Sequence, residues 1–286
     1  MPNMSGASPA VTVGVPVYNA GQYLTETLRS ILAQTFTDFE LVISDNASTD
    51  GTRDICDSFA RADSRIRYVR QPANIGAPRN HNALVALARG RYFKWSSASD
   101  LIEPGFLAAC VPILESRRDV ALVYSRTRFF DATTGSVRDY ADGLNLLSDD
   151  PLERYKECDR RLAENNALYG VIRIDALRSS TLHWDYRSSD MELVVELALY
   201  GKFVEVPQAL FYRRTEAGAR YDPARHRAFY PHQLFAHDVF CAWQTLGQML
   251  HAAQRAPLSL SERARLYDYL ARRVWWRRKR LLGAQA

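Results

Sequence analysis

The first hundred residues alternate short apolar runs with segments in which apolar residues recur at helical spacing. The apolar runs read as β-strands and are residues 11–18, 39–44, 66–70 and 91–96. After the first run, Leu24, Leu28 and Ile31 share one face of a helix, and Leu84 and Leu87 do so before the fourth. Strands separated by helices of about ten or more residues connect by right-handed crossovers, so the pattern predicts an α/β fold with a mostly parallel sheet.

The pattern is looser after residue 101, but it still predicts a series of elements. They are a strand at 120–131, a helix at 150–165, an extended segment at 167–173, a helix at 188–201, a strand at 202–214 and helices over 228–282. Thr134-Gly135 indicates a turn after the first of these strands. Pro207 should break the second strand, and Pro257 should separate the last helices.

Polar residues follow each of the four N-terminal strands. The strand ends are Tyr18-Asn19, Asp45-Asn46, residues 70–79 and residues 96–100. Open parallel sheets bind ligands at these carboxyl ends. The first strand is not followed by G-x-G-x-x-G and the chain has no G-x-x-x-x-G-K-[ST], which argues against a dehydrogenase-type site and a P-loop. A nucleotide held differently still fits, with Asp45 accepting from a base N–H and Tyr18 beside a ring. When each residue is taken alone, turn formation or helix capping is the better explanation.

Composition places the chain among folded, soluble proteins. It has 286 residues, 47% of them apolar and 11% aromatic, enough for one large domain or two small ones. No apolar run approaches the ~20 residues that span a bilayer, and the N-terminus lacks a signal-peptide pattern, so we expect a cytoplasmic protein. Cys56, Cys110, Cys158 and Cys241 lack the spacing of zinc or redox motifs, and we expect them to be reduced and mostly buried.

The net charge of +5 comes from the C-terminal tail. Residues 272–280 hold six Lys and Arg residues and no acid, so subtracting six from +5 leaves −1 for the rest of the chain. A nearly neutral body is a poor binder of a polyphosphate backbone, which argues against nucleic acid as a partner. Residues 272–282 also contain Trp275 and Trp276 and form an amphipathic basic segment. This segment fits peripheral contact with an anionic membrane, or docking of its tryptophans onto the protein.

Residues 11–52, VTVGVPVYNAGQYLTETLRSILAQTFTDFELVISDNASTDGT, closely resemble the start of the family 2 glycosyltransferases, which have the GT-A fold. The resemblance continues through NIGAPRNHNAL and GRYFKWSSASD, reappears at ALYGVIR and in residues 188–214, and so covers nearly all of residues 11–214. It implies a Rossmann-like, mostly parallel sheet flanked by helices. Residues 1–100 would form the nucleotide-binding half of the GT-A domain and 101–220 its acceptor-binding half. Residues 221–286 would be a helical C-terminal extension with a basic tail.

The resemblance also implies an activity. Family members move a sugar from a nucleoside diphosphate, such as a UDP-, GDP- or dTDP-sugar, to an acceptor hydroxyl, usually with inversion. The acceptor would be a glycan, a lipid-linked sugar or a small molecule. Two other classes compete with this activity: a non-catalytic nucleotide- or glycan-binding relative, and a nucleotidyltransferase. The latter would need a glycine- and lysine-rich loop after the first strand, and VPVYNAGQYL has none.

The resemblance assigns the nucleotide site to two turns and one loop. The turn from Pro16 to Asn19, with Tyr18, and the acid at Asp45 would hold the base, and Asn46 follows in the same loop. The segment from Asn74 to Asn80 would line the pocket. Arg79 within it would contact phosphate, although an arginine at a helix start also fits a solvated surface.

The acidic cluster that family members carry after the fourth strand, often Asp-x-Asp-Asp, reads Ser97-Ala98-Ser99-Asp100 here. The resemblance places Asp100 at the position that touches a divalent cation, Mn²⁺ or Mg²⁺, and Ser99 still offers the ribose a hydroxyl. The two lost acids should weaken cation binding without the nucleotide. A histidine that many relatives carry after the last strand is missing, and His226 lies too far along. An arginine or lysine that neutralises the diphosphate, without metal, is therefore the alternative.

Asp190 matches the general base of the family, which takes the proton of the acceptor hydroxyl. The helix dipole favours its ionised form at this position. A structural explanation competes, because Ser189 and Glu192 have the spacing of a capping box. Four residues near the expected acceptor cleft read as core or lining residues and receive no role: Asn166, Tyr169, Trp184 and Tyr186.

Overall fold

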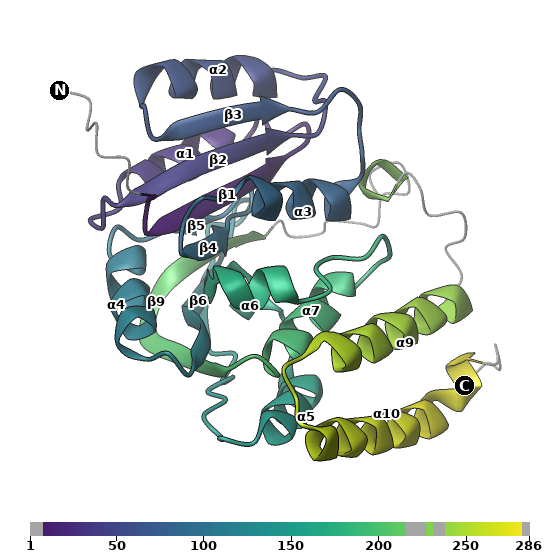
Figure 1. Ribbon diagram of the computed structural model, residues 1–286. Helices are drawn as coiled ribbons and strands as arrows, with labels where there is room; N and C mark the ends of the chain where they lie inside the picture. The colour runs from purple at the N-terminus through teal and green to yellow at the C-terminus, as the bar shows by residue number, and fades with distance from the viewer. Residues whose placement is uncertain (1–7, 216–226, 231–237, 282–286) are drawn as a thin grey trace.

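The computed structural model describes residues 8–215, 227–230 and 238–281, and these form a single sheet with helices on both faces (Figure 1). In the described ranges the sheet has nine strands in the order β3-β2-β1-β4-β8-β6-β9-β5, and β7 pairs with β6. His226, considered above for the cation site, lies outside the described residues.

The first four strands are parallel neighbours, as the pattern predicted. They are β1 (Val11–Val17), β2 (Phe39–Asp45), β3 (Ile66–Arg70) and β4 (Tyr92–Trp95), connected by α1 (Leu24–Leu32), α2 (Thr52–Ala62) and α3 (Ala77–Leu87). Val17 pairs with Asp45, which in turn pairs with Arg70. The carboxyl ends of three strands are therefore level, and the polar residues that follow them share one edge of the sheet.

The second half of the sheet is mixed and does not follow chain order. Its strands are β5 (Leu101–Ile102), β6 (Val120–Asp131), β7 (Val137–Tyr140), β8 (Val171–Arg173) and β9 (Lys202–Thr215). The short β8 runs antiparallel to both β4 and β6, whereas β6 and β9 are parallel. Leu101 of β5 pairs with Tyr212 of β9. This pairing brings the end of the last strand beside the segment that follows β4.

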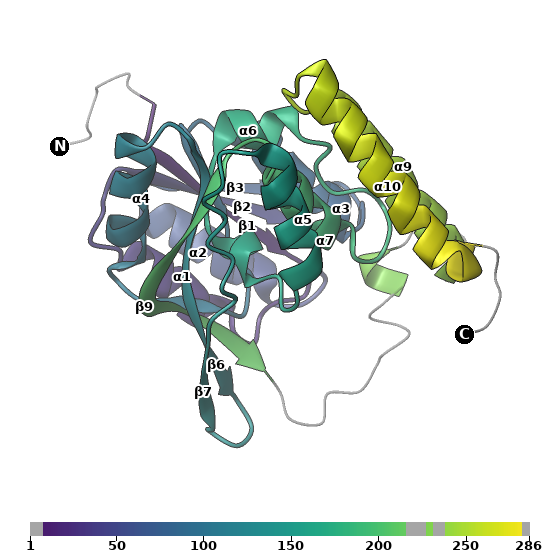
Figure 2. The same cartoon turned by 90° about the horizontal axis from the view of Figure 1, so that it is seen from below.

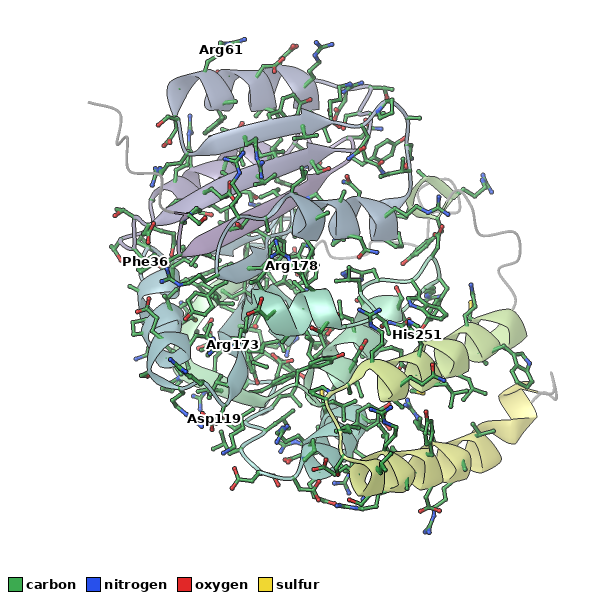
Figure 3. The ribbon with its side chains drawn as sticks, in the orientation of Figure 1. Phe36, Arg61, Asp119, Arg173, Arg178 and His251 are labelled. Carbon is green, nitrogen blue, oxygen red and sulfur yellow. The ribbon has the colours of Figure 1, made fainter. Side chains whose placement is uncertain are left out.

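Two apolar cores lie on opposite faces of the sheet. The first packs α1, α2 and α4 (Phe106–Ser116) against the valines at alternate positions of β1. The second packs the sheet against α3, α5 (Pro151–Arg161), α6 (Ile174–Ser179), α7 (Ser189–Leu197) and the C-terminal helices. Gly14 faces this second core, because a Cβ there would lie 2.7 Å from the Phe93 ring. Arg173, labelled in Figure 3, ties β8 to the end of α4 by donating to the carbonyls of Leu114 and Arg117.

The C-terminal extension is a pair of helices beside the second core. α9 (Asp238–Arg255) contacts α7, α10 (Leu260–Leu281) contacts α5, and the break between them falls at the expected Pro257 (Figures 1 and 2). His251 of α9 faces Trp184 with ring centroids 6.2 Å apart (Figure 3). Within the described residues, no helix is both long enough and apolar enough to cross a membrane.

Several elements differ from the sequence pattern. Residues 167–173, expected to be extended, begin as a 3-10 helix, η1 (Asn166–Tyr169), and only then enter β8. Pro207 does not break the strand, since β9 continues through it; Ser125 pairs with Val206 and Arg126 with Ala209, which leaves the proline in a bulge. The cysteines are free as expected, and three of the four are buried.

Candidate active site

A cleft of about 740 Å³ lies at the carboxyl ends of β1, β2 and β4. It collects residues from the loops after these strands, from the start of α3 and from the end of β9. Six residues that the sequence assigned to nucleotide binding line it: Pro16, Tyr18, Asn19, Asn46, Asn80 and Ser99. These distant residues meet because β1 and β2 end at the same level and β4 is paired beside β1. Asp45, Asn74, Arg79, Asp100 and Asp190 are not among the lining residues.

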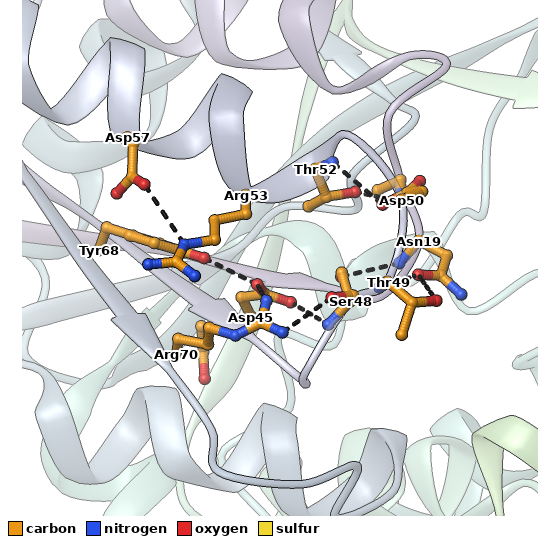
Figure 4. A network of polar contacts seen from close by, with 12 residues as sticks. Asn19, Asp45, Ser48, Thr49, Asp50, Thr52, Arg53, Asp57, Tyr68 and Arg70 are labelled. Atoms are coloured by element: carbon orange, nitrogen blue, oxygen red, sulfur yellow. Dashed lines mark hydrogen bonds and ion pairs between the residues drawn. The ribbon is translucent and has the colours of Figure 1, made fainter.

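Asp45, the last residue of β2, does not line the cleft and is completely buried. Figure 4 shows its polar contacts. Its Oδ1 accepts the backbone N–H of Ser48, and its Oδ2 accepts from the Tyr68 hydroxyl at 2.7 Å and from Arg70 at 2.6 Å. The first contact forms a turn and does not cap α2, which begins at Thr52. Because both oxygens are engaged within the protein, Asp45 holds the loop after β2 in place.

The loops after β1 and β2 are bonded to each other along the rim of the cleft (Figure 4). Asn19 has a left-handed backbone with φ of 48°, its N–H donates to the Ser48 hydroxyl, and its Oδ1 accepts from the Thr49 N–H. Asparagine tolerates this conformation better than most residues. Thr52 adds a third bond by accepting from the Ala20 N–H. The rim is therefore held in shape before any ligand binds.

Three asparagines connect the end of β2 to α3 and to the segment before it. The Asn46 amide donates to Asn74 Oδ1 at 2.7 Å and accepts the backbone N–H of Ile75 at 2.8 Å. Asn80, which is buried, exchanges bonds with Ser44 through both ends of its amide. Asn74 thus reaches the cleft indirectly, through Asn46.

Arg79 does not face the cleft in this structure. Its guanidinium pairs with Asp185 at 3.2 Å, and its side chain is 56% exposed. Arg79 therefore has the solvent-exposed position that the sequence offered as the alternative. Its contact with phosphate stays a prediction.

Asp100 follows β4 and is only 5% exposed. Its Oδ1 accepts the backbone N–H of Arg214 at 2.9 Å, and in the described ranges no residue donates to Oδ2. Burial raises its pKa to about 6, against the opposing effect of that hydrogen bond and of the nearby charges of Arg213 and Lys94. The carboxylate is therefore mostly ionised at neutral pH while it lies almost out of contact with water.

Lys94 lies in β4 below this carboxylate and is completely buried. Its ammonium donates to the carbonyls of Trp95 and Tyr169 and lies 4.5 Å from the centroid of the Phe106 ring. Burial lowers its pKa to about 7, although the Asp100 charge opposes this. Lys94 connects β4 to η1, whose Tyr169 lines the cleft.

Arg214, at the end of β9, contributes a positive charge to the cleft wall. Its Nε donates to the Ser99 carbonyl at 2.9 Å, and its terminal nitrogen pairs with Glu26 at 2.5 Å. Tyr23 and Phe130 lie against the guanidinium, with ring centroids at 4.1 Å and 4.6 Å. These contacts fix the arginine beside Ser99.

Asp190 lies in the first turn of α7 and is partly buried. Its Oδ2 accepts from the Asn165 amide at 2.9 Å. Its charge acts on two residues that line the cleft: it opposes the lowering of the His81 pKa by burial, and it adds to the rise that burial causes in the Tyr169 pKa. Asp190 does not line the cleft, but its charge is felt by two residues that do.

The capping-box explanation for this region is wrong. α7 begins one residue earlier than that motif requires, with Ser188 at the N-cap in a left-handed conformation (φ of 71°) and no side-chain cap hydrogen bond. Glu192 instead lies 3.7 Å from Arg273 of α10. Tyr186, which received no role, is a core residue that donates to Gln248 at 2.6 Å.

The protein atoms near Asp100 could supply only part of the coordination shell of a divalent cation. In the part of the chain that the structure describes, no group of three or more His, Cys, Asp or Glu side chains is arranged to hold a metal. Asp100 offers one oxygen, because the other is bonded to Arg214. Mg²⁺ commonly takes one or two carboxylates and fills its shell with phosphate oxygens and water. The site thus fits a cation that the donor's diphosphate brings with it, and it does not fit one held by the protein alone.

Sequence reasoning missed Arg214 and Lys94. Lys94 interrupts an apolar strand with a charge, and that interruption was a usable signal. Arg214 carried no signal of its own, because its contact with Asp100 spans 114 residues and depends on the pairing of β5 with β9.

Comparisons with known proteins found a matching family model, related sequences and solved structures of similar fold. A family model described as Glycosyl transferase family 2 matches residues 12–177. GlyG of Streptococcus pneumoniae is 29% identical over 139 residues, which cover 49% of this chain and 46% of GlyG. TuaG of Bacillus subtilis is 38% identical over 171 residues, which cover 59% of this chain and 61% of TuaG. The chain therefore spans about half to three fifths of the length of these relatives.

Solved structures share the fold at low sequence identity. S. aureus TarS, residues 1–349, in complex with UDP-GlcNAc superposes with a TM-score of 0.67 at 14% identity, covering 96% of this chain and 79% of that one. The mannosyltransferase PcManGT of Pyrobaculum calidifontis, in complex with GDP-Man and Mn²⁺, superposes with a TM-score of 0.54 at 19% identity, covering 98% and 86%. At these identities the likeness shows the architecture, and it confirms the α/β fold predicted from the sequence.

Proposed function

The chain belongs to glycosyltransferase family 2 and has the GT-A fold, and from this premise we propose that it transfers a sugar from a nucleoside diphosphate to an acceptor hydroxyl. The observation that carries the proposal is the cleft at the carboxyl ends of β1, β2 and β4. Its volume of about 740 Å³ lies within the range of roughly 300–1,000 Å³ typical of small-molecule sites. TarS with UDP-GlcNAc and PcManGT with GDP-Man make UDP- and GDP-sugars the first donors to test, followed by dTDP-sugars.

We assign the donor to this cleft and its base to the rim formed by the two bonded loops. Tyr18 offers a ring face to the base, and the Asn19 and Asn46 side chains offer polar contacts. Asp45 and Asn74 act through the loops that they hold, as their internal hydrogen bonds support. Ser99 offers a hydroxyl to the ribose. Residues 1–100 then form the nucleotide-binding half, 101–220 the acceptor-binding half and 221–286 the extension.

The reaction that this arrangement supports is a single displacement. Asp190 accepts the proton of the acceptor hydroxyl while that oxygen forms its bond to the anomeric carbon. The bond from this carbon to the diphosphate breaks, its electron pair stays on the phosphate oxygen, and the configuration inverts. The Asn165 amide holds the Asp190 carboxylate in position by a 2.9 Å bond. The first turn of α7 stabilises the negative charge that Asp190 needs in order to act as a base.

Asp100 would hold a Mn²⁺ or Mg²⁺ ion through Oδ2. When bound, the ion supplies positive charge to the diphosphate. The protein's own part is to keep the Asp100 carboxylate ionised and oriented, through the Arg214 N–H and the nearby cations. The structure of PcManGT with Mn²⁺ supports a cation in this fold.

A thermal-shift series with UDP-GlcNAc, GDP-Man and dTDP-glucose, each with and without Mn²⁺, tests the donor assignment. We expect one nucleotide class to raise the melting temperature, and to raise it more with Mn²⁺. If none of the three changes the melting temperature, the donor assignment is wrong. If EDTA leaves binding and turnover unchanged, the assignment of Asp100 to a cation is wrong.

Asp190→Asn tests the base. General-base catalysis is typically worth 10²–10⁴-fold, so turnover should fall by about that factor while donor binding survives, since Asp190 does not line the cleft. Turnover is measured as nucleoside diphosphate released from the stabilising donor in the presence of a panel of glycan and lipid-linked acceptors. Glu192→Gln, two residues along the same helix, is the matched control and should keep its activity. Equal turnover in Asp190→Asn and wild type would exclude this residue as the base.

A non-catalytic binding relative is the second candidate, because Ser97 and Ser99 leave Asp100 as the last acid of the cluster. The same experiments separate the two. Donor binding without turnover on any acceptor, in wild type as well as in Asp190→Asn, would favour the binding protein.

We also propose that the basic tail contacts an anionic membrane. Within residues 272–282, Arg273 turns inward and pairs with Asp159 at 2.7 Å, so it is not available to lipid. Arg272 is 73% exposed, and the side chains from 275 onward lie outside the described ones. Deleting residues 275–286 keeps the Arg273 pair and should reduce cosedimentation with phosphatidylserine vesicles. Equal cosedimentation of the full and shortened chains would refute the membrane proposal.

A further inference from the structure

We propose that Arg214 binds the diphosphate of the donor, so that the cleft holds part of the nucleotide's charge without a cation. The inference rests on the proposed function and deepens it, because it names the protein group that recognises the diphosphate. It starts from the composition of the cleft wall. Among the described lining residues there is no Asp, Glu or Lys, and Arg214 is the one arginine. A ligand with two or more negative charges therefore meets a wall whose single fixed charge is positive.

The guanidinium of Arg214 is fixed in place, yet it keeps donors free. Of its five N–H groups, Nε–H donates to the Ser99 carbonyl and one terminal N–H to Glu26. The remaining donors have no acceptor among the described residues. Tyr23 and Phe130 lie against the guanidinium, and the side chain is only 9% exposed. An arginine already held in this way loses little conformational freedom when it binds phosphate.

The surroundings of Arg214 favour an anion over a cation. Ser97 and Ser99 line the cleft beside it, at positions where an acid would repel a phosphate. Asp100 lies behind these serines, outside the lining, and bonds the backbone N–H of Arg214 through Oδ1. Glu26 is the other acid in contact, and its side chain is 58% exposed to water. Neither carboxylate lies between the guanidinium and the cleft.

The same residue helps the leaving group to depart. As the bond from the anomeric carbon to the phosphate oxygen breaks, the electron pair stays on that oxygen, and the diphosphate gains negative charge. The guanidinium donates hydrogen bonds to the diphosphate, while the acceptor's proton resides on Asp190. Arg214 remains protonated throughout, so it acts by charge and hydrogen bonding without exchanging a proton.

Arg213 provides a matched control from the neighbouring position of the same strand. Successive strand residues point to opposite faces, and Arg213 donates to the Glu164 carbonyl and to Asn166 Oδ1 at 2.9 Å. It does not line the cleft. Replacing it removes an equal charge from the end of β9 and leaves the guanidinium at the cleft wall in place.

The experiment compares a nucleoside diphosphate with its own nucleoside. Titration calorimetry measures UDP against uridine, GDP against guanosine and dTDP against thymidine in wild type, Arg214→Gln, Arg214→Lys and Arg213→Gln, each in EDTA and in Mn²⁺. In EDTA the wild type should still prefer the diphosphate to the nucleoside. Arg214→Gln should reduce that preference by about 10–100-fold, which corresponds to ~1.4–2.8 kcal/mol. Arg214→Lys should retain part of it, and Arg213→Gln should keep it.

Within each variant, the ratio of the affinity for the diphosphate to the affinity for the nucleoside separates a binding effect from a folding defect. A folding defect weakens the binding of both ligands together. An unchanged ratio in Arg214→Gln would overturn the inference while leaving the donor site intact. An equal loss in Arg213→Gln would also overturn it, because net charge alone would then explain the effect. If wild type binds none of UDP, GDP and dTDP in either buffer, the donor assignment fails first, and this inference fails with it.

Discussion

Replacing Asp100 with asparagine should stabilise the folded protein at neutral pH. Asparagine has the same shape, and its Oδ1 still accepts the backbone N–H of Arg214, so the substitution removes a charge and little else. Asp100 is 5% exposed, and burial raises its pKa from 3.8 to about 6. The folded protein therefore carries a charge that is more stable in the unfolded chain.

The size of the effect follows from the two pKa values. A tenfold change in proton affinity is worth ~1.4 kcal/mol, so a pKa of about 6 in place of 3.8 corresponds to at most ~3 kcal/mol. Because the folded pKa is the higher one, the wild type loses this stability as pH rises from about 4 to about 6, and the loss is constant above that. Asp100→Asn should therefore exceed wild type by about 1–3 kcal/mol near pH 8 and by almost nothing near pH 4.

Urea denaturation followed by circular dichroism near pH 4 and pH 8 measures both differences. Near pH 8, Lys94 with a pKa of about 7 is largely neutral, so it loses little when the Asp100 charge is removed. Asp119→Asn is a control of opposite sign: hydrogen bonds from Arg117 and Lys202 lower the Asp119 pKa to about 2, so its removal should reduce stability near pH 8. If Asp100→Asn gains nothing near pH 8, or gains equally at both pH values, burial of this charge does not cost the protein stability.

Two further substitutions test the packing and the charge pairs around the site. Gly170→Ala should lower the free energy of unfolding by ~2–3 kcal/mol in urea denaturation, because a Cβ would lie 2.6 Å from the Val123 carbonyl oxygen. Gly105→Ala, with nothing within 4 Å of the new Cβ, should change it by less than ~1 kcal/mol, and equal effects would contradict the packing argument. Arg70→Leu should also lower the free energy of unfolding, because the completely buried Asp45 loses its 2.6 Å ion pair; an unchanged denaturation midpoint would show that the pair is not needed.

The N-terminal half of the fold could be predicted because its information is local. Valines at alternate positions of β1 and a continuous apolar run in β2 predict strands whatever their neighbours are. The order of strands in the second half could not be predicted, because β8 separates β4 from β6 and the partner of β5 is more than 100 residues away. Pro207 shows the same limit, since a bulge opposite Ser125 and Arg126 keeps the strand continuous.

The candidate site shows a similar division. The strand ends predicted that Tyr18 and Asn46 would lie together, since the carboxyl ends of parallel strands meet at one edge of the sheet, whereas Asn80 was assigned by the resemblance alone. They could not predict that the Asp45 carboxylate is bonded to Tyr68 and Arg70, because one acid after a strand gives no sign of its partners. The N-cap of α7 was also not predictable from the sequence. Ser188 adopts a left-handed conformation there, which serine rarely does.

The helix α7 and the strand β9 follow one another directly in the chain, with Asp190 at the beginning of the helix and Arg214 near the end of the strand. Between them, Gly201 leaves no room for a side chain, because a Cβ would lie 2.9 Å from the backbone atoms of Asp119 and Ala121. The turn is thereby clamped to β6. The distance between Asp190, the proposed general base, and Arg214, the proposed diphosphate-binding residue, therefore depends on this fixed turn. An insertion at residue 201 should change that distance even with every side chain of the cleft intact.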